Sequence, residues 1–190
     1  MPLFLKSRIC FIHVPKCGGT TVVKAFEELL GDPPVHYSED FSKVQWHPLQ
    51  HSPQHTTYRV LKGMNMVPDG FEVVSFVRDP VERFLSEYAW RRTGVLQDEF
   101  AERFFSHDPE LFWDNHHLSQ YDFLDPGFGE IEIRLMGDIS SYFGERFGVM
   151  PGVWNSSRSR ELTITECAKK LVETHWAKDF DLLESIRSRA

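Results

Sequence analysis

One segment near the amino terminus constrains the fold more than any other part of the chain. Residues 9–14 form a short apolar run of β-branched and aromatic side chains, as expected of a buried strand. The loop PKCGG follows directly, and residues 20–30 then have a composition typical of a helix, which Gly31, Pro33 and Pro34 end. The order strand, glycine loop, helix predicts a P-loop-like unit of an α/β fold, with its loop at the carboxyl end of the strand.

The loop carries groups that suit a chain of phosphate oxygens. Paired glycines let the backbone turn with its N–H groups pointing inward, and the amino end of the next helix adds a favourable dipole. The lysine adds a mobile positive charge, and the two threonines add hydroxyl donors. The alternative is a turn whose glycines only satisfy backbone geometry. The predicted phosphate-binding residues are Pro15, Lys16, Cys17, Gly18, Gly19, Thr20 and Thr21.

The order of lysine and glycines separates this loop from the usual nucleotide-binding P-loop. That loop reads GxxxxGK[ST], with its lysine after the glycines, whereas Lys16 precedes Gly18 and Gly19. Asp79 could imitate the magnesium-holding carboxylate of a kinase, but its position directly before Pro80 is explained more simply by helix capping. A kinase-like phosphotransferase therefore stays an alternative, as does an inactive nucleotide-binding protein.

A second strand-to-helix junction carries an arginine. Residues 71–77 are almost continuously apolar, as expected of a parallel strand covered on both faces, and a helix is predicted over residues 80–92. Arg78 lies at the junction, and Ser86 lies about two helical turns beyond Asp79, on the same face. An arginine fork with a serine hydroxyl suits a phosphate monoester. A structural ion pair and a small packing residue would give the same pattern.

The remaining sequence continues the alternation of strands and helices. Thr163 and Glu166 have the spacing of a capping box for a last helix through Trp176. We therefore expect a single domain over residues 1–190, of the α/β class, with a mainly parallel sheet flanked by helices. The other predicted elements are helices over residues 97–105, 110–117 and 136–147 and a strand over residues 131–135.

Composition argues against several classes of function. The net charge of −7 makes nucleic-acid binding an unsuitable role, because such binding requires a basic surface. Three widely spaced cysteines without a CxxC pair argue against a disulfide framework or a thiolate zinc site and favour a reducing compartment. Lys6 and Arg8 interrupt the apolar start before it reaches the length of a signal-peptide core, and no apolar run approaches ~20 residues. We expect a cytoplasmic protein without a membrane span.

The two junctions together resemble the sulfotransferases that use 3′-phosphoadenosine 5′-phosphosulfate (PAPS). The chain has PKCGGT and RDPVERFLSEY in the order of the family motifs PKxGGT and RxPxxRxxSxY. It particularly resembles the carbohydrate branch, which contains the heparan sulfate sulfotransferases and small bacterial relatives. The later stretches SQYDFL and WNSS also look like family features. The resemblance implies an enzyme that moves a sulfuryl group from PAPS to an acceptor hydroxyl and releases adenosine 3′,5′-bisphosphate.

The resemblance also implies roles for individual residues. The glycine loop would surround the phosphosulfate, Lys16 would stabilise the leaving phosphate, and Arg78 and Ser86 would hold the 3′-phosphate. Because Lys16 supplies the positive charge, no metal ion is expected. Residues 155–158 would close over the nucleotide. A carbohydrate hydroxyl is the acceptor that the resemblance favours, while a peptide, a lipid or a small metabolite stays open.

A general base is needed because the acceptor hydroxyl must lose its proton as it attacks. His47, His51 and His55 are spaced by four residues, but two intervening prolines break the helix that a metal-binding face would require. Ser52 and Pro53 instead predict an N-cap and a first turn that contains His55, where the helix dipole favours neutral imidazole. His55 is the predicted base, as the resemblance also implies, and His51 is the second candidate. Surface or loop histidines are the alternative.

Other histidines and aromatic residues carry less specific expectations. His13 lies on the first strand and is expected to pack beside the loop. His116 and His117 cannot share one helix face, and we expect them at the solvent or in an acceptor cleft. Faces for sugar stacking could come from several aromatic residues, although such residues more often belong to the core. They are Trp46, Trp90, Trp113 and Tyr121.

Overall fold

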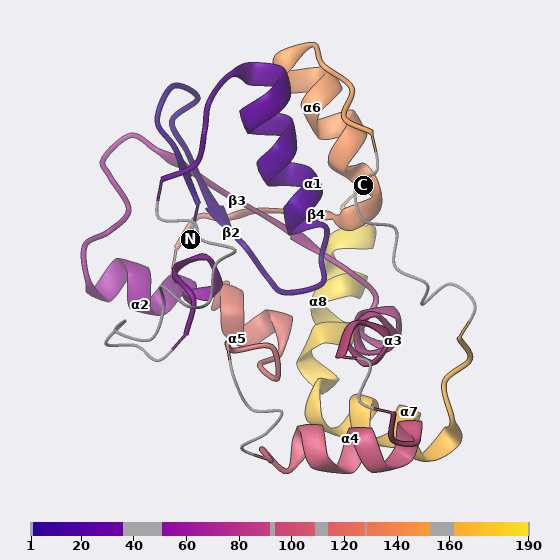
Figure 1. Ribbon diagram of the computed structural model, residues 1–190. Helices are drawn as coiled ribbons and strands as arrows, with labels where there is room; N and C mark the ends of the chain where they lie inside the picture. The colour runs from indigo at the N-terminus through magenta and orange to yellow at the C-terminus, as the bar shows by residue number, and fades with distance from the viewer. Residues whose placement is uncertain are drawn as a thin grey trace.

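The fold is built on one mainly parallel sheet, as Figure 1 shows. The computed structural model describes residues 2–35, 51–91, 94–108, 114–127, 129–152 and 162–189. In this part of the chain the strands are β1 (Leu3–Phe4), β2 (Ile9–Ile12), β3 (Glu72–Val77) and β4 (Glu132–Leu135), and they lie in that order across the sheet. β1 pairs antiparallel with β2, whereas β2, β3 and β4 are parallel. The predicted α/β class with a mainly parallel sheet is confirmed.

Helices follow each parallel strand and continue to the carboxyl end. The α-helices are α1 (Gly19–Lys24), α2 (Tyr58–Gly63), α3 (Pro80–Arg91), α4 (Gln97–Phe105), α5 (Gln120–Leu124), α6 (Ile139–Phe147), α7 (Glu166–His175) and α8 (Ala177–Arg187). The π-helical turn η1 (Ala25–Leu29) continues α1, and short 3-10 helices form η3 (Pro53–His55) and η4 (Met136–Asp138). No helix among the described residues is long and apolar enough to cross a membrane.

Both faces of the central strands β2 and β3 are covered, which explains their apolar runs. Ile9 and Phe11 of β2 face α1, η1 and α6, whose apolar side chains form one core with them. Cys10 and Ile12, which alternate with them, face α2, α5 and α8 on the other side. Figure 1 shows α1 and α6 together on one side of the sheet, away from α2 and α5.

A third core lies beyond the carboxyl ends of the strands. Phe84 of α3 packs with Phe100 and Phe104 of α4 and with Trp176, which follows α7. Figure 1 shows α3, α4 and α7 grouped below the sheet. α3 therefore has an apolar side that anchors it in this cluster and leaves other side chains, among them Arg83, to contact the glycine loop.

The structure corrects two predicted boundaries. The last long helix is capped by Thr165, whose Oγ1 accepts from the backbone N–H of Ala168, and not by Thr163. It ends at His175, and α8 begins two residues later. The helix predicted over residues 110–117 is not formed at its described end, because residues 114–117 make a turn that begins with Asp114 and Asn115 at positive φ. Residues 110–113 lie outside the described residues.

Candidate active site

The glycine loop joins β2 to α1, as predicted, and neighbouring side chains require its two glycines. Gly18 has φ +82°, and a Cβ at this position would lie 2.6 Å from Cδ1 of Ile139. A Cβ on Gly19 would overlap the ring of His13, so His13 packs directly against the start of α1. The expectation for His13 is confirmed. The loop backbone is therefore fixed by packing from α6 on one side and from His13 on the other.

The side chains of the loop have different surroundings. Cys17 is buried and its Sγ donates to Oε1 of Gln120 (3.1 Å), while burial raises its pKa to about 11. Its side chain is thus directed into the protein, and only its backbone remains for a ligand. Thr21 is buried, whereas Thr20 is partly exposed at the first turn of α1. Lys16 has φ +67°, which turns the chain at the position of the lysine.

Lys16 lies against the helix of the second junction. Its Nζ is 4.7 Å from the ring centroid of Trp90 on α3. Burial lowers the pKa of Lys16, Glu87 opposes that shift, and the charges of Arg78 and Arg91 reinforce it. The two junctions that the sequence identified therefore meet at one place, and three cationic residues act on the same region.

Arg78 follows β3, with its side chain 12% exposed. Its Nε donates to Oε2 of Glu82 (3.1 Å), so Arg78 makes the structural ion pair that was the alternative to a phosphate clamp. Asp79 caps α3, because its Oδ1 accepts from the backbone N–H groups of Val81 and Glu82. This use of Asp79 agrees with the capping interpretation. Ser86 lies on the buried side of α3.

A buried arginine fastens the glycine loop to the rest of the site. Arg83 donates to the carbonyl oxygens of Pro15 (3.1 Å), Leu118 (2.9 Å) and His116 (3.0 Å). Its guanidinium also stacks over the ring of Trp176, with 4.3 Å between Cζ and the ring centroid. One fully buried cation thus holds the loop, the segment before α5 and α3 in one arrangement.

His55 lies beside the glycine loop, next to His13. It ends the 3-10 turn η3 and is 6% exposed, and its Nδ1 donates to Oδ2 of Asp114 (2.7 Å). The other oxygen of Asp114 accepts from the backbone N–H of Ser52 (2.6 Å), which fixes the carboxylate. The ring of His55 lies 4.9 Å from that of His13, the residue packed on the loop. The predicted base therefore adjoins the glycine loop.

The protonation state of His55 follows from burial more than from the helix dipole. Burial lowers its pKa to about 4, and the hydrogen bond to Asp114 only partly opposes this shift. The 3-10 turn is three residues long, too short for the dipole argument made from the sequence. His55 is consequently neutral at pH 7, with its proton on Nδ1 facing Asp114, so Nε2 carries the free lone pair.

His116 joins His13 and His55 in a cluster of three histidines and lies on its α3 side. It is buried, and its Nδ1 donates to Oε2 of Glu87 (2.7 Å), whose other oxygen accepts from Nε of Arg91 (2.6 Å). Its ring lies 4.8 Å from that of His55 and stacks on Trp90 at 5.2 Å. Of the two places expected for His116, a position at the solvent is wrong, because a buried carboxylate holds it, and a position in an acceptor cleft stays a prediction. His117 is partly buried, and its pKa is lowered to about 4, first by burial.

The comparison with known families decides the identity of the chain. The sequence model described as the sulfotransferase family matches residues 5–132, a span that contains both junctions and the histidine cluster. The chain belongs to the sulfotransferase family. No curated protein and no solved structure matched it. The protein is thus a PAPS-dependent sulfotransferase, and PAPS is its sulfuryl donor.

Several important residues of this sulfotransferase were not predicted from its sequence. Asp114 has no local motif, and the helix prediction over residues 110–117 hid the turn that carries it. Arg83 and Glu87 lie inside the second motif and Gln120 inside the stretch SQYDFL, so position in a motif could have marked them. His51 is buried and its Nδ1 donates to the carbonyl of Ser52 (2.9 Å), apart from the His55–Asp114 pair.

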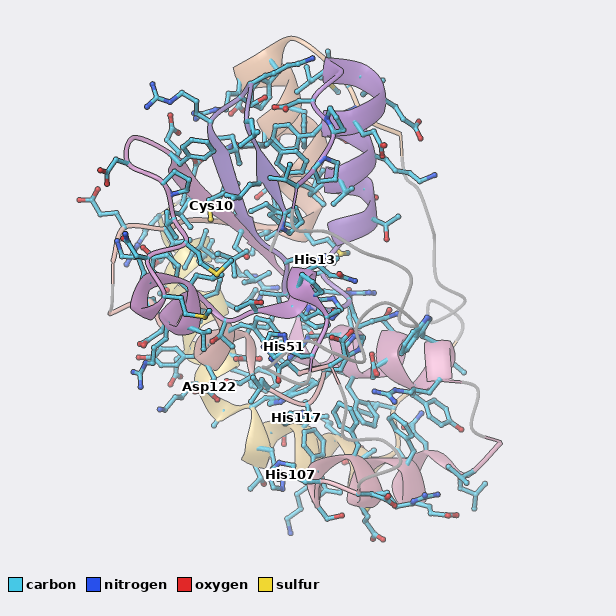
Figure 2. The ribbon with its side chains drawn as sticks, turned by 60° about the vertical axis from the view of Figure 1, so that its left-hand side comes forward. Cys10, His13, His51, His107, His117 and Asp122 are labelled. Carbon is cyan, nitrogen blue, oxygen red and sulfur yellow. The ribbon has the colours of Figure 1, made fainter. Side chains whose placement is uncertain are left out.

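Figure 2 shows His13, His51, His117 and His107 following one another down the middle of the view, from the end of β2 toward α4. Among the described residues, His55, Asp114 and His116 bring one ligand atom each within 4.8 Å of one another. The 2.7 Å hydrogen bond between His55 and Asp114 accounts for the shortest of these approaches. That the sulfotransferase needs no metal stays a prediction. His47, Trp46, Trp113 and residues 155–158 lie outside the described residues.

Proposed function

We propose that this sulfotransferase sulfates a hydroxyl group of a carbohydrate, as a small bacterial-type member of the heparan sulfate sulfotransferase-like branch. The observation that carries the mechanism is the buried His55–Asp114 pair beside the His13 ring that packs on Gly19. This arrangement gives a neutral, oriented imidazole next to a loop suited to phosphate. Such a pair is what sulfuryl transfer to a weakly acidic hydroxyl requires.

The donor would lie across both junctions. The backbone of residues 15–19 and the hydroxyls of Thr20 and Thr21 would surround the 5′-phosphosulfate, with Lys16 beside them. Arg78 and Ser86 would hold the 3′-phosphate. The present partner of Arg78 is Glu82, whose side chain is mostly exposed and can return to water when a phosphate replaces it. The dianion would then form the stronger, charge-assisted hydrogen bonds with the guanidinium.

The transfer step follows from these positions. The acceptor oxygen attacks sulfur while Nε2 of His55 takes the hydroxyl proton, and the bond between sulfur and the bridging phosphate oxygen breaks. Negative charge develops on the leaving 5′-phosphate, where Lys16 stabilises it. Asp114 accepts the Nδ1 hydrogen bond throughout and stabilises the imidazolium that forms. His55 is then the base, Asp114 the residue that orients it, and Lys16 the cation that stabilises the leaving phosphate.

The carbohydrate assignment rests on the family branch and on Trp90. This tryptophan is 42% exposed, and the ammonium group of Lys16 lies 4.7 Å from its ring centroid. An exposed aromatic ring next to the lysine that would stabilise the leaving phosphate offers a surface for the C–H faces of a sugar. The net charge of −7 counts against a densely sulfated polyanion as the acceptor. Tyr121 is a weaker candidate, because it is less exposed than Trp90 and its ring lies beside Lys178 and not beside Lys16.

An acceptor screen tests this proposal. The purified protein is incubated with PAPS and matched panels of oligosaccharides, tyrosine peptides, phenols and hydroxylated lipids, and products are identified by mass spectrometry. We expect a gain of one SO₃ group on saccharides, with release of adenosine 3′,5′-bisphosphate. Transfer confined to peptides, phenols or lipids would contradict the carbohydrate assignment. A Trp90→Ala variant should raise KM for the saccharide more than it lowers kcat, because it removes binding surface but no reacting group.

A further inference from the structure

We infer that Gln120 is a positioning residue that links the two donor-binding junctions and thereby sets recognition of the 3′-phosphate. The inference rests on the proposed role of Arg78. The side-chain amide of Gln120 lies between the junctions: its Oε1 accepts from the backbone N–H of Arg78 (2.8 Å) and from Sγ of Cys17 (3.1 Å). Its Nε2 donates to the carbonyl of Arg78 (2.8 Å).

The pairing of Gln120 with Arg78 acts like an added strand at the end of β3. β3 ends at Val77, its last pair with β4 being Val77 with Leu135. At the next residue the amide of Gln120 supplies both hydrogen bonds, so the backbone of Arg78 stays fixed where sheet pairing has stopped. A fixed backbone restricts the directions that the Arg78 guanidinium can take. This is how a residue outside the ligand site can act on phosphate recognition.

Gln120 is itself held rigidly from the opposite side. It is 1% exposed and begins α5, and its own backbone N–H donates to Oδ2 of Asp179 (2.9 Å). The N–H of Tyr121 donates to the second oxygen of the same carboxylate (2.9 Å), and Arg83 lies 3.8 Å from it. Because Arg83 also holds the carbonyl of Pro15, the loop, Arg78 and Gln120 belong to one buried network.

Shared hydrogen bonding gives Gln120 a role beyond packing. One oxygen atom accepts from both Cys17 in the first junction and Arg78 in the second, so a shift of the loop changes the surroundings of Arg78. A ligand that orders the loop through its 5′-phosphate would therefore also favour the orientation of Arg78 that meets the 3′-phosphate. By linkage, the 3′-phosphate should strengthen 5′-phosphate binding to the same degree.

The test replaces one atom of this amide. Gln120→Glu keeps the acceptor for Cys17 and for the Arg78 N–H but puts a carboxylate oxygen against the Arg78 carbonyl. Calorimetry measures the ratio of the Kd for adenosine 5′-monophosphate to the Kd for adenosine 3′,5′-bisphosphate. At about pH 8 we expect this ratio to fall by roughly tenfold or more relative to wild type, because a buried acceptor loses its donor.

Lowering the pH should restore the ratio of the two Kd values in Gln120→Glu. A residue that only stabilised the fold would not give this recovery. Burial raises the pKa of a carboxyl, and a protonated Glu can again donate to the Arg78 carbonyl. At about pH 6 the ratio, taken relative to wild type at the same pH, should approach one. Gln97→Glu is the matched control. The amide of Gln97 likewise bridges backbone groups, from the carbonyl of Thr163 to the N–H of Thr165, but it does so at the α4–α7 contact.

The outcomes separate this inference from the proposed function. Arg78→Ala is measured first: if it leaves the ratio unchanged, the arginine clamp is wrong, and the role of Gln120 falls with it. If Arg78→Ala lowers the ratio while a folded Gln120→Glu keeps the wild-type value, Gln120 alone has been assigned wrongly. Should Gln120→Glu fail to unfold cooperatively, Gln120→Met is measured for the same loss, because it removes both amide hydrogen bonds to Arg78 and the amide acceptor of Cys17 without adding charge. A Gln97→Glu variant that loses selectivity equally would also overturn the inference.

Discussion

The two strand-to-helix junctions of this sulfotransferase are built in opposite ways. The first gains its shape from two glycines and the side chains packed on them, His13 and Ile139, and its lysine remains beside the exposed ring of Trp90. The second gains its shape from buried side-chain hydrogen bonds that arrive from elsewhere in the chain, above all those of Gln120. In the proposed mechanism, the first junction serves the chemical step and the second serves recognition of the donor.

The largest effect should follow from removing His55, the proposed base that adjoins the first junction. We expect His55→Ala to lower turnover by ~10²–10⁴-fold with little change in donor binding, the usual range for a general base. The acidic limb of the profile of kcat/KM against pH, expected near the free-enzyme pKa of about 4, should disappear. Steady-state kinetics across pH provides the measurement. His51→Ala should be much milder, and equal losses for the two variants would show that the base has been misassigned.

A loss of ~10²–10³-fold in kcat is expected for Lys16→Ala, because the charge on the leaving phosphate loses its partner. Folding should be retained, since the shape of the loop depends on Gly18 and Gly19 and not on the lysine side chain. Lys24→Ala, at a partly exposed position on α1 with Glu28 as its partner, is the control and should turn over normally. Near-normal turnover of Lys16→Ala would remove the functional distinction between the junctions.

Arg78→Ala tests the recognition role of the second junction. The variant should bind adenosine 3′,5′-bisphosphate more weakly by about 2 kcal/mol and adenosine 5′-monophosphate almost as well as wild type does. The estimate stays at the low end because the Arg78 side chain is partly exposed and already has Glu82 as a partner. Calorimetry with both nucleotides gives the two affinities. Equal losses would mean that Arg78 supports the site as a whole and does not read the 3′-phosphate.

The stability of the protein should also depend on pH. The folded pKa values of His55 and His117 are about 4, below the ordinary 6.5, so between these values the unfolded chain binds protons that the folded protein does not. The free energy of unfolding should therefore fall as pH drops from 6.5 toward 4, by at most about 1.4 kcal/mol per pH unit for each histidine. Urea unfolding at several pH values measures the slope.

His117→Gln should reduce this slope, by a limited amount because His117 is only partly buried. Activity at pH 7 should not fall, because His117 lies outside the His55–Asp114 pair. A slope that stays the same in His117→Gln would mean that its pKa is not depressed in the folded state. Glu87 and Asp114 should affect the free energy of unfolding only at lower pH. Although burial alone would raise their pKa values, hydrogen bonds from His116 and His55, respectively, hold both below the usual range.

Local sequence was sufficient to predict most of the fold. The strands at residues 9–14, 71–77 and 131–135 are confirmed to within two residues at either end. The first two are nearly continuous apolar runs that are buried, whereas the third alternates charged and apolar residues and is half-buried. The helices after both junctions are confirmed as well. The edge strand β1 was missed, since two residues carry no periodic signal.

What the sequence could not give depends on contacts between distant residues. Thr163 and Thr165 are both plausible caps, and the backbone of both is held by the side chain of Gln97, which is 68 residues from Thr165. The same holds at the site: His55 and Asp114 are 59 residues apart, and Gln120 lies 42 residues from Arg78. A motif identifies a residue that contacts a ligand, but the partner that orients it follows from tertiary packing alone.

The burial of two of the three cysteines has a practical consequence for spectroscopy. Burial raises the pKa values of Cys10 to about 12 and of Cys17 to about 11, so both remain thiols and react poorly with maleimides. Cys167 is exposed at the start of α7, which Figure 1 shows at the far end of the molecule from β2 and α1. A fluorophore would therefore attach selectively at Cys167, which allows single-site labelling of the unmodified sequence away from the glycine loop.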